Sequence, residues 1–246
     1  MVRLLSEWFL FEEPGDAELP KRKWHLNARI GFALLITLAT TLWFLAFNRN
    51  LAGGSVRMSH LEWLGVTAAM YGLSLVPLLL VLLIEKTVFK SKILPMLGLK
   101  PTPGAVTDKL KYIVLIFAVA LAVFWARFAL HMGGQITWIA FLYQIPENML
   151  VAFCEELVFR GYIQSAMTQK WGDVPGVLAT AALFLVVHLP VRILLQYRGP
   201  AQLAFSLAFT LVGGVVFGFC ARKDRCIYGS AALHFSMNLC HYMVLL

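Results

Sequence analysis

The stretch PENMLVAFCEELVFRGYIQ, residues 146–164, places Glu147, Glu155, Glu156 and Arg160 within a run of mostly apolar side chains. The whole chain is similarly apolar, since 60% of its 246 residues are hydrophobic, 14% are charged and the mean hydropathy is +0.75. Soluble domains carry roughly a quarter charged residues. A water-soluble core cannot absorb so much apolar surface, so the composition predicts a chain that lies in a lipid bilayer.

Long apolar runs follow one another along the chain and predict an all-α fold, a polytopic bundle of about seven transmembrane helices. Their expected ranges are 30–47, 64–84, 112–130, about 136–166, 174–189, 201–220 and 227–246, and Pro190 is expected to end the fifth. Residues 1–29 are predicted to form a cytoplasmic segment with an interfacial helix. Residues 30–246 then form the membrane domain, and the chemistry-bearing residues lie in 136–246.

The distribution of positive charge predicts the orientation of these helices. With the N-terminus in the cytoplasm, 16 of the 21 Lys and Arg residues fall in cytoplasmic segments and five in outer ones. Cytoplasmic loops are enriched in Lys and Arg, so this division favours a cytoplasmic N-terminus and a C-terminus on the opposite side. The net charge of +8 is explained by these loops and does not indicate a nucleic-acid partner.

Glu155, His188 and His234 belong to three different predicted helices but lie at comparable depth. Glu155 precedes Trp171 by 16 residues and His188 follows it by 17. At about 1.5 Å per residue, both are therefore roughly 25 Å of helix from the same turn. His234 is about 15 Å of helix beyond the turn expected at Asp224. Antiparallel packing is thus expected to bring one carboxylate and two imidazoles together inside the bundle.

The position of each polar residue along its predicted helix determines the direction in which its side chain points. Glu155 and Glu156 are adjacent and point about 100° apart, so they cannot face the same atom equally. Glu156 and Arg160 have the i, i+4 order that favours an ion pair. Glu155 must then find its partner on another helix, because charged groups at membrane depth are costly when alone. Asn238 shares a helix face with His234 at i, i+4.

These residue types support two kinds of hydrolytic chemistry. A carboxylate and an imidazole can take a proton from water and deliver one to a leaving amine, while a second imidazole and an amide can stabilise an oxyanion. Alternatively, Glu155, His188 and His234 match the ligand set of a catalytic zinc site. The sequence leaves both open; we favour no metal, with zinc as the alternative cofactor. Neither a GxSxG nor an HExxH motif is present, and no pair of the four cysteines forms CxxC.

Three ordered segments resemble the motifs EExxxR, FxxxH and HxxxN of the CPBP family. They are EELVFRG (155–161), FLVVH (184–188) and HFSMN (234–238). This family comprises type II CAAX prenyl endopeptidases and Abi-type bacteriocin-processing or immunity proteins. The resemblance covers about residues 136–246.

The resemblance implies an intramembrane endopeptidase whose substrate is a membrane-associated protein or peptide. It implies that Glu155 and His188 activate water and that His234 and Asn238 stabilise the oxyanion. Glu156, Arg160 and Phe184 would support the site. Two other functions remain open at this point, a non-catalytic membrane scaffold or immunity protein of the same fold, and a proton-coupled transporter, because intramembrane Glu and His also serve as proton relays.

Overall fold

The computed structural model of the chain describes residues 23–51, 75–89, 97–99, 103–129, 138–194 and 199–245. All regular elements in these ranges are helices, which confirms the predicted fold class. By length and composition, three helical stretches can cross a membrane: Leu26–Trp43, Asp173–Leu194 and Pro200–Asp224. The number of seven spans and the orientation of the termini stay predictions.

The helices fall into two groups along the chain. The N-terminal group contains α2 (Lys23–Leu51), a helical segment at 75–84 that continues into the π-helix η1 (Glu85–Phe89), the 3-10 helix η2 (Thr107–Lys109) and α5 (Leu110–Ala129). The C-terminal group contains α6 (Trp138–Glu156), the π-helix η3 (Leu157–Gln164), α7 (Ser165–Trp171), α8 (Asp173–Leu194), α9 (Pro200–Asp224) and α10 (Tyr228–Leu245).

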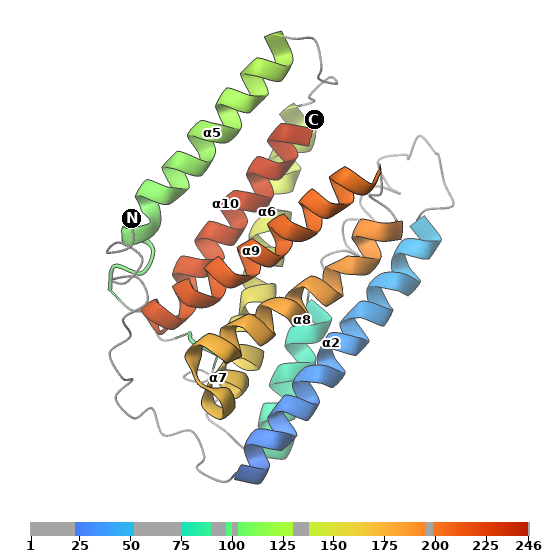
Figure 1. Cartoon of the computed structure of the whole chain (residues 1–246), viewed down its shortest axis with the longest axis vertical. Helices are drawn as coiled ribbons and strands as arrows, with labels where there is room; N and C mark the ends of the chain where they lie inside the picture. The colour runs from blue at the N-terminus through green and yellow to red at the C-terminus, as the bar shows by residue number, and fades with distance from the viewer. Residues whose placement is uncertain are drawn as a thin grey trace.

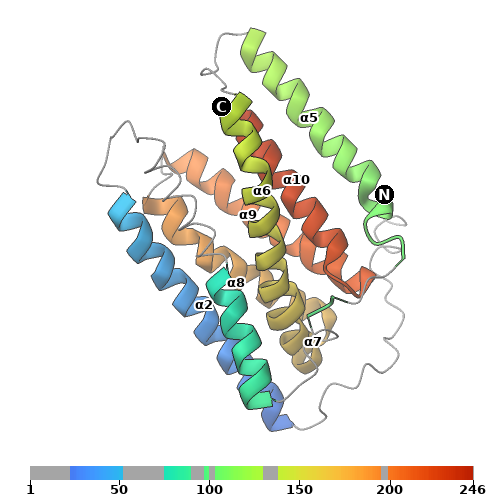
Figure 2. The same ribbon diagram turned by 180° about the vertical axis from the view of Figure 1, so that it is seen from behind.

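Successive long helices run in alternating directions through one bundle (Figure 1). Helices α8 and α9 pack along each other, α10 packs against α5, α6 and α9, and α2 packs against α8. Seen from behind, the segment at 75–89 lies beside α2 and the lower half of α6 (Figure 2). Large apolar side chains are exposed on the outside of this bundle, as expected for a surface in contact with lipid; examples are Leu79, Leu115, Leu194, Phe205 and Val212.

Two turns that determine the depth of the site fall where the sequence predicted them. The α7–α8 turn is at Gly172, whose φ of 86° suits a glycine directly after a helix. Helix α9 ends at Asp224, whose carboxylate accepts a hydrogen bond of 2.8 Å from the buried ammonium of Lys109. Burial disfavours the charged ammonium, but the hydrogen bond and charge of Asp224 together raise the pKa of Lys109 above its ordinary value. The two side chains thus fasten η2 to the α9–α10 turn.

Two predicted helix boundaries require correction. Pro190 does not end the fifth helix, because α8 continues through it to Leu194. Proline removes only the one N–H that would donate to the carbonyl oxygen of Val186, and membrane helices tolerate such a loss because neighbouring groups can satisfy the freed carbonyl. The first helix begins at Lys23 and not at Ile30, so the last residues of the predicted N-terminal segment are helical. The interfacial helix expected before them lies outside the described residues.

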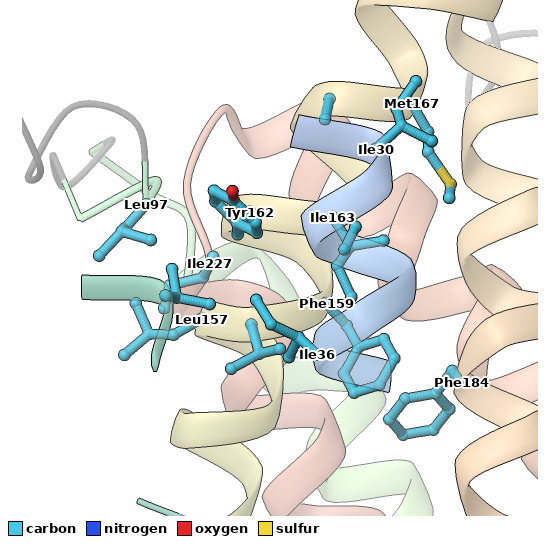
Figure 3. Close-up of a cluster of buried hydrophobic side chains, with 14 of the residues drawn as sticks. Ile30, Ile36, Leu97, Leu157, Phe159, Tyr162, Ile163, Met167, Phe184 and Ile227 are labelled. Carbon is cyan, nitrogen blue, oxygen red and sulfur yellow. The ribbon is translucent and has the colours of Figure 1, made fainter. Parts of the chain in front are cut away.

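The main apolar core surrounds η3, which is buried along its whole length. Figure 3 shows Leu157, Phe159, Tyr162 and Ile163 of η3 among side chains from α2, α7 and α8 and from the segments at 97–99 and 227. Gly161 permits this packing, because an added Cβ would lie 2.6 Å from the carbonyl oxygen of Leu97. The N-terminal helices are therefore built into the same core as the segment that follows Glu155 and Glu156.

Helix α9 approaches η3 and α8 closely through its glycines. A Cβ on Gly218 would lie 2.7 Å from Oε1 of Gln164 and 2.8 Å from Cγ1 of Val177. A Cβ on Gly214 would lie 3.3 Å from the Cβ of Ala181. The GxxxG pattern at 214–218 therefore serves close helix packing.

Candidate active site

Three helices bring Glu155, His188 and His234 to one point, in the arrangement that the depth argument predicted. Oε2 of Glu155, at the end of α6, lies 4.0 Å from Nε2 of His188 on α8 and 3.7 Å from Nε2 of His234 on α10. The same oxygen is buried and accepts no hydrogen bond within the described part of the chain. One carboxylate oxygen and two ring nitrogens thus converge from three helices.

A backbone contact fixes the proton of the His188 ring. Nδ1 of His188 lies 2.7 Å from the carbonyl oxygen of Phe184, one turn earlier on α8. A carbonyl oxygen only accepts, so Nδ1–H is the donor. In the neutral ring, Nε2 then carries the lone pair, and this is the atom that faces Glu155. Nε2 of His188 can therefore accept a proton on the side of the ring that faces Glu155.

The second carboxylate, Glu156, orients the other imidazole. Oε1 of Glu156 accepts a hydrogen bond of 3.1 Å from Nδ1 of His234, and Oε2 lies 3.4 Å from Nε of Arg160. Arg160 also donates to the carbonyl oxygen of Gly214 at 3.3 Å. The i, i+4 ion pair predicted from the sequence is therefore present, and Glu156 also turns Nε2 of His234 toward Glu155. This second contact was not predicted.

Aromatic rings enclose the histidines and the arginine. The ring of Phe184 lies 4.4 Å from that of His188 and 5.7 Å from that of His234, and the guanidinium of Arg160 sits 4.6 Å above it. Phe217 of α9 stacks on His234 at 4.7 Å with an interplanar angle of 20°. Phe217 is a residue of the site that sequence reasoning missed, because it belongs to none of the three motifs.

Asn238 lies one turn beyond His234 on α10 and is half-buried. No hydrogen bond links its side chain to Glu155, His188 or His234 among the contacts found in the described ranges. The shared helix face is as predicted, but the role of Asn238 at the oxyanion stays a prediction.

The site has a buried base and a more accessible side. The side chains of Glu156 and Arg160 have no exposed surface and that of His234 is 5% exposed. Glu155 and His188 retain 18% and 24%. The side chains of Glu155 and His188 are thus partly exposed, although Oε2 of Glu155 itself is buried, while Glu156 and Arg160, which hold His234, are fully enclosed. This gradient is typical of a site in which buried residues position accessible ones.

The separations around Glu155 are wider than those between ligands of a zinc ion, and the metal-free site stays a prediction. Donor atoms about 2.0 Å from one tetrahedral zinc are about 3.3 Å from each other, and both separations from Glu155 are longer. In the portion of the chain that the structure describes, no group of three or more His, Cys, Asp or Glu side chains is placed to hold a metal. Cys154, Cys220 and Cys226 are buried free thiols, as their spacing predicted.

The fold and the site together define an integral membrane protein with a buried cluster of acidic and histidine residues, side chains that hydrolytic enzymes use. Residues 137–240 match the family model described as "Type II CAAX prenyl endopeptidase Rce1-like". This match over the C-terminal part of the chain confirms the resemblance predicted from the three motifs. The matched family is a family of proteases. No curated protein and no solved structure matches the chain.

Proposed function

We propose that the protein is an intramembrane endopeptidase that hydrolyses a peptide bond of a membrane-associated protein or peptide. The observation that carries this proposal is the convergence of Oε2 of Glu155 with Nε2 of His188 and of His234, at 4.0 and 3.7 Å. A water molecule at this point would contact a carboxylate and a ring nitrogen with a free lone pair. Both groups can take its proton while its oxygen attacks a carbonyl carbon.

Charge balance supports the proton transfer. With both carboxylates ionised and both rings neutral, the cluster of Glu155, Glu156 and Arg160 carries one excess negative charge, which is costly at membrane depth. One proton shared between Glu155 and the two Nε2 atoms removes it. The cluster can therefore hold the proton taken from water and pass it to the amine nitrogen as the C–N bond breaks.

His234 and Asn238 would stabilise the oxyanion of the tetrahedral intermediate. Since Nδ1 of His234 is already engaged with Glu156, only Nε2 can donate to the oxyanion, and it does so when the ring carries the shared proton. Arg160 and Glu156 act through His234 by holding its ring in place. The reaction needs no metal ion in this scheme.

A matched pair of variants tests the proposal. Glu155→Gln keeps the size of the side chain and removes the base, whereas Glu147→Gln removes an acidic group two turns earlier on the same helix, outside the cluster. Peptide termini are compared by mass spectrometry in cells that contain the native protein, Glu155→Gln or Glu147→Gln. We expect fragments that are present with the native protein and Glu147→Gln and absent with Glu155→Gln. Equal fragment sets in all three would refute the peptidase.

Elemental analysis of the purified protein tests the metal-free scheme. We expect less than a stoichiometric amount of zinc and unchanged cleavage after treatment with a chelator. One zinc per chain that is lost in His188→Ala would instead assign Glu155, His188 and His234 as ligands.

A further inference from the structure

Helix α9 carries none of the three motifs, yet its inner face lies against the site. Gly214, Phe217 and Gly218 are spaced i, i+3, i+4 and therefore share this face. The carbonyl oxygens of the two glycines accept hydrogen bonds from Arg160 and Gln164 of η3, at 3.3 and 2.8 Å. The glycines let the backbone of α9 approach, and this approach brings the ring of Phe217 onto His234.

Phe217 is a buried residue, 3% exposed, and has two partners in the site. Its ring is 4.7 Å from the imidazole of His234 and nearly parallel to it, with an angle of 20°. The guanidinium of Arg160 lies 5.6 Å from the centre of the same ring. Phe217 thus contacts the imidazole that faces Glu155 and the arginine that holds Glu156.

The orientation of the His234 ring needs more than its hydrogen bond. The bond from Nδ1 to Glu156 fixes one atom, but the ring plane can still tilt about that atom. Phe217 lies flat on one side, and Phe184 meets the ring edge-on, at 5.7 Å and 78°. Together the two aromatic rings determine the plane, and the plane determines where Nε2 points.

We infer that Phe217 is a positioning residue, which holds the plane of the His234 ring so that Nε2 stays directed at Glu155. The inference rests on the proposed function, and it adds α9 to the elements that determine the reaction rate. Aromatic pairs of this geometry stabilise each other beyond simple burial. A small displacement of a reacting group reduces a rate by up to about a hundredfold, so the loss of the ring affects turnover more than stability.

Three variants test the inference on the full-length protein in proteoliposomes. Phe217→Leu removes the ring but keeps an apolar side chain, and Phe217→Tyr keeps the ring. Phe219→Leu removes another buried ring of α9, two residues further and therefore about 200° around the helix. With the cleaved peptide as substrate, we expect kcat to fall about tenfold in Phe217→Leu with KM unchanged. Phe217→Tyr should recover most of kcat, and Phe219→Leu should keep it.

A second measurement needs no substrate and so separates this inference from the proposed function. Diethyl pyrocarbonate modifies free imidazole nitrogens, and peptide mass spectrometry gives its rate at His234. We expect several-fold faster modification in Phe217→Leu than in the native protein, Phe217→Tyr or Phe219→Leu. If the native protein cleaves nothing, the peptidase is wrong, while this rate still tests the positioning. Equal modification rates in all four proteins, or equal losses of kcat in Phe217→Leu and Phe219→Leu, would overturn the role of Phe217.

Discussion

The bundle buries two groups of charged side chains that differ in composition. Arg29 of α2 and Glu85 of η1 form an ion pair of 3.1 Å, with side chains 3% and 0% exposed. The site cluster combines two carboxylates, one guanidinium and two imidazoles, contributed by α6, η3, α8 and α10. In the first group a guanidinium contacts a carboxylate. The second group contains more titratable side chains, and two of its imidazoles face one oxygen, Oε2 of Glu155.

This difference teaches which buried charges indicate chemistry. The ion pair of Arg29 and Glu85 contains no imidazole, the side chain that most often transfers protons in catalysis. The pair joins α2 to the segment at 75–89, and removal of one member breaks a buried ion pair. The site cluster contains two imidazoles, each with a ring nitrogen that can accept or donate a proton. We therefore expect substitutions to affect folding in the first group and turnover in the second.

The largest expected effect is on turnover. His188→Gln removes the ring nitrogen that faces Glu155, and the loss of a positioned base typically reduces a rate by about 10²–10⁴-fold. The side chain of His188 is 24% exposed, so thermal unfolding in detergent should stay close to that of the native protein. Cleavage of the peptide in proteoliposomes measures the rate. A residual activity above one tenth of the native value would contradict the role of His188.

The second expected effect is on stability, and it tests the other group. Glu85→Gln removes the carboxylate that the buried guanidinium of Arg29 contacts, and breaking a buried ion pair in this way costs about 3–5 kcal/mol. Changing both residues, as Arg29→Met with Glu85→Gln, should recover much of this loss, because neither charge of the pair remains. Reversible unfolding in mixed micelles measures the free energy of each variant.

The kcat per folded molecule, measured in the same preparations, shows whether the pair of Arg29 and Glu85 affects turnover as well as stability. It should stay unchanged in Glu85→Gln, since Arg29 and Glu85 belong to α2 and η1, which contribute no side chain to the site cluster. A large fall in kcat at full stability would mean that the ion pair takes part in the reaction, and the distinction between the two groups would fail.

Much of the site could be predicted because the positions of its helices and turns depend on short stretches of sequence. Apolar runs predicted the helices, and glycine and charged residues predicted the turns. Residue counts from those turns then placed Glu155, His188 and His234 at comparable depth. The rotation of each helix and its distance from its neighbours depend on packing between segments far apart in the sequence. For this reason the stacking of Phe217 on His234 was not predicted.

The π-helix η3 and the ion pair between Arg29 and Glu85 were missed for the same reason. The close contact of Gly161 with the backbone at Leu97 is a feature of tertiary packing, and no local pattern shows it. Arg29 and Glu85 are 56 residues apart and were assigned to the ends of two different predicted segments. A positive charge at the end of an apolar run is ordinarily explained as a topology signal, so no pattern in the sequence indicates that Arg29 and Glu85 meet inside the bundle.

The smallest expected effect comes from an ion pair that is partly open to solvent. Nε of Arg222 lies 2.7 Å from a carboxylate oxygen of Asp173, and the two side chains are 26% and 23% exposed. Exposed pairs contribute about 0–1 kcal/mol, so Arg222→Gln should change the free energy of unfolding by less than about 1 kcal/mol and leave kcat unaltered. The same unfolding and cleavage assays measure it beside Glu85→Gln. If Arg222→Gln destabilised the protein as much as Glu85→Gln, burial would not be what distinguishes the ion pairs, and the effect of Glu85→Gln would need another cause than the loss of a buried ion pair.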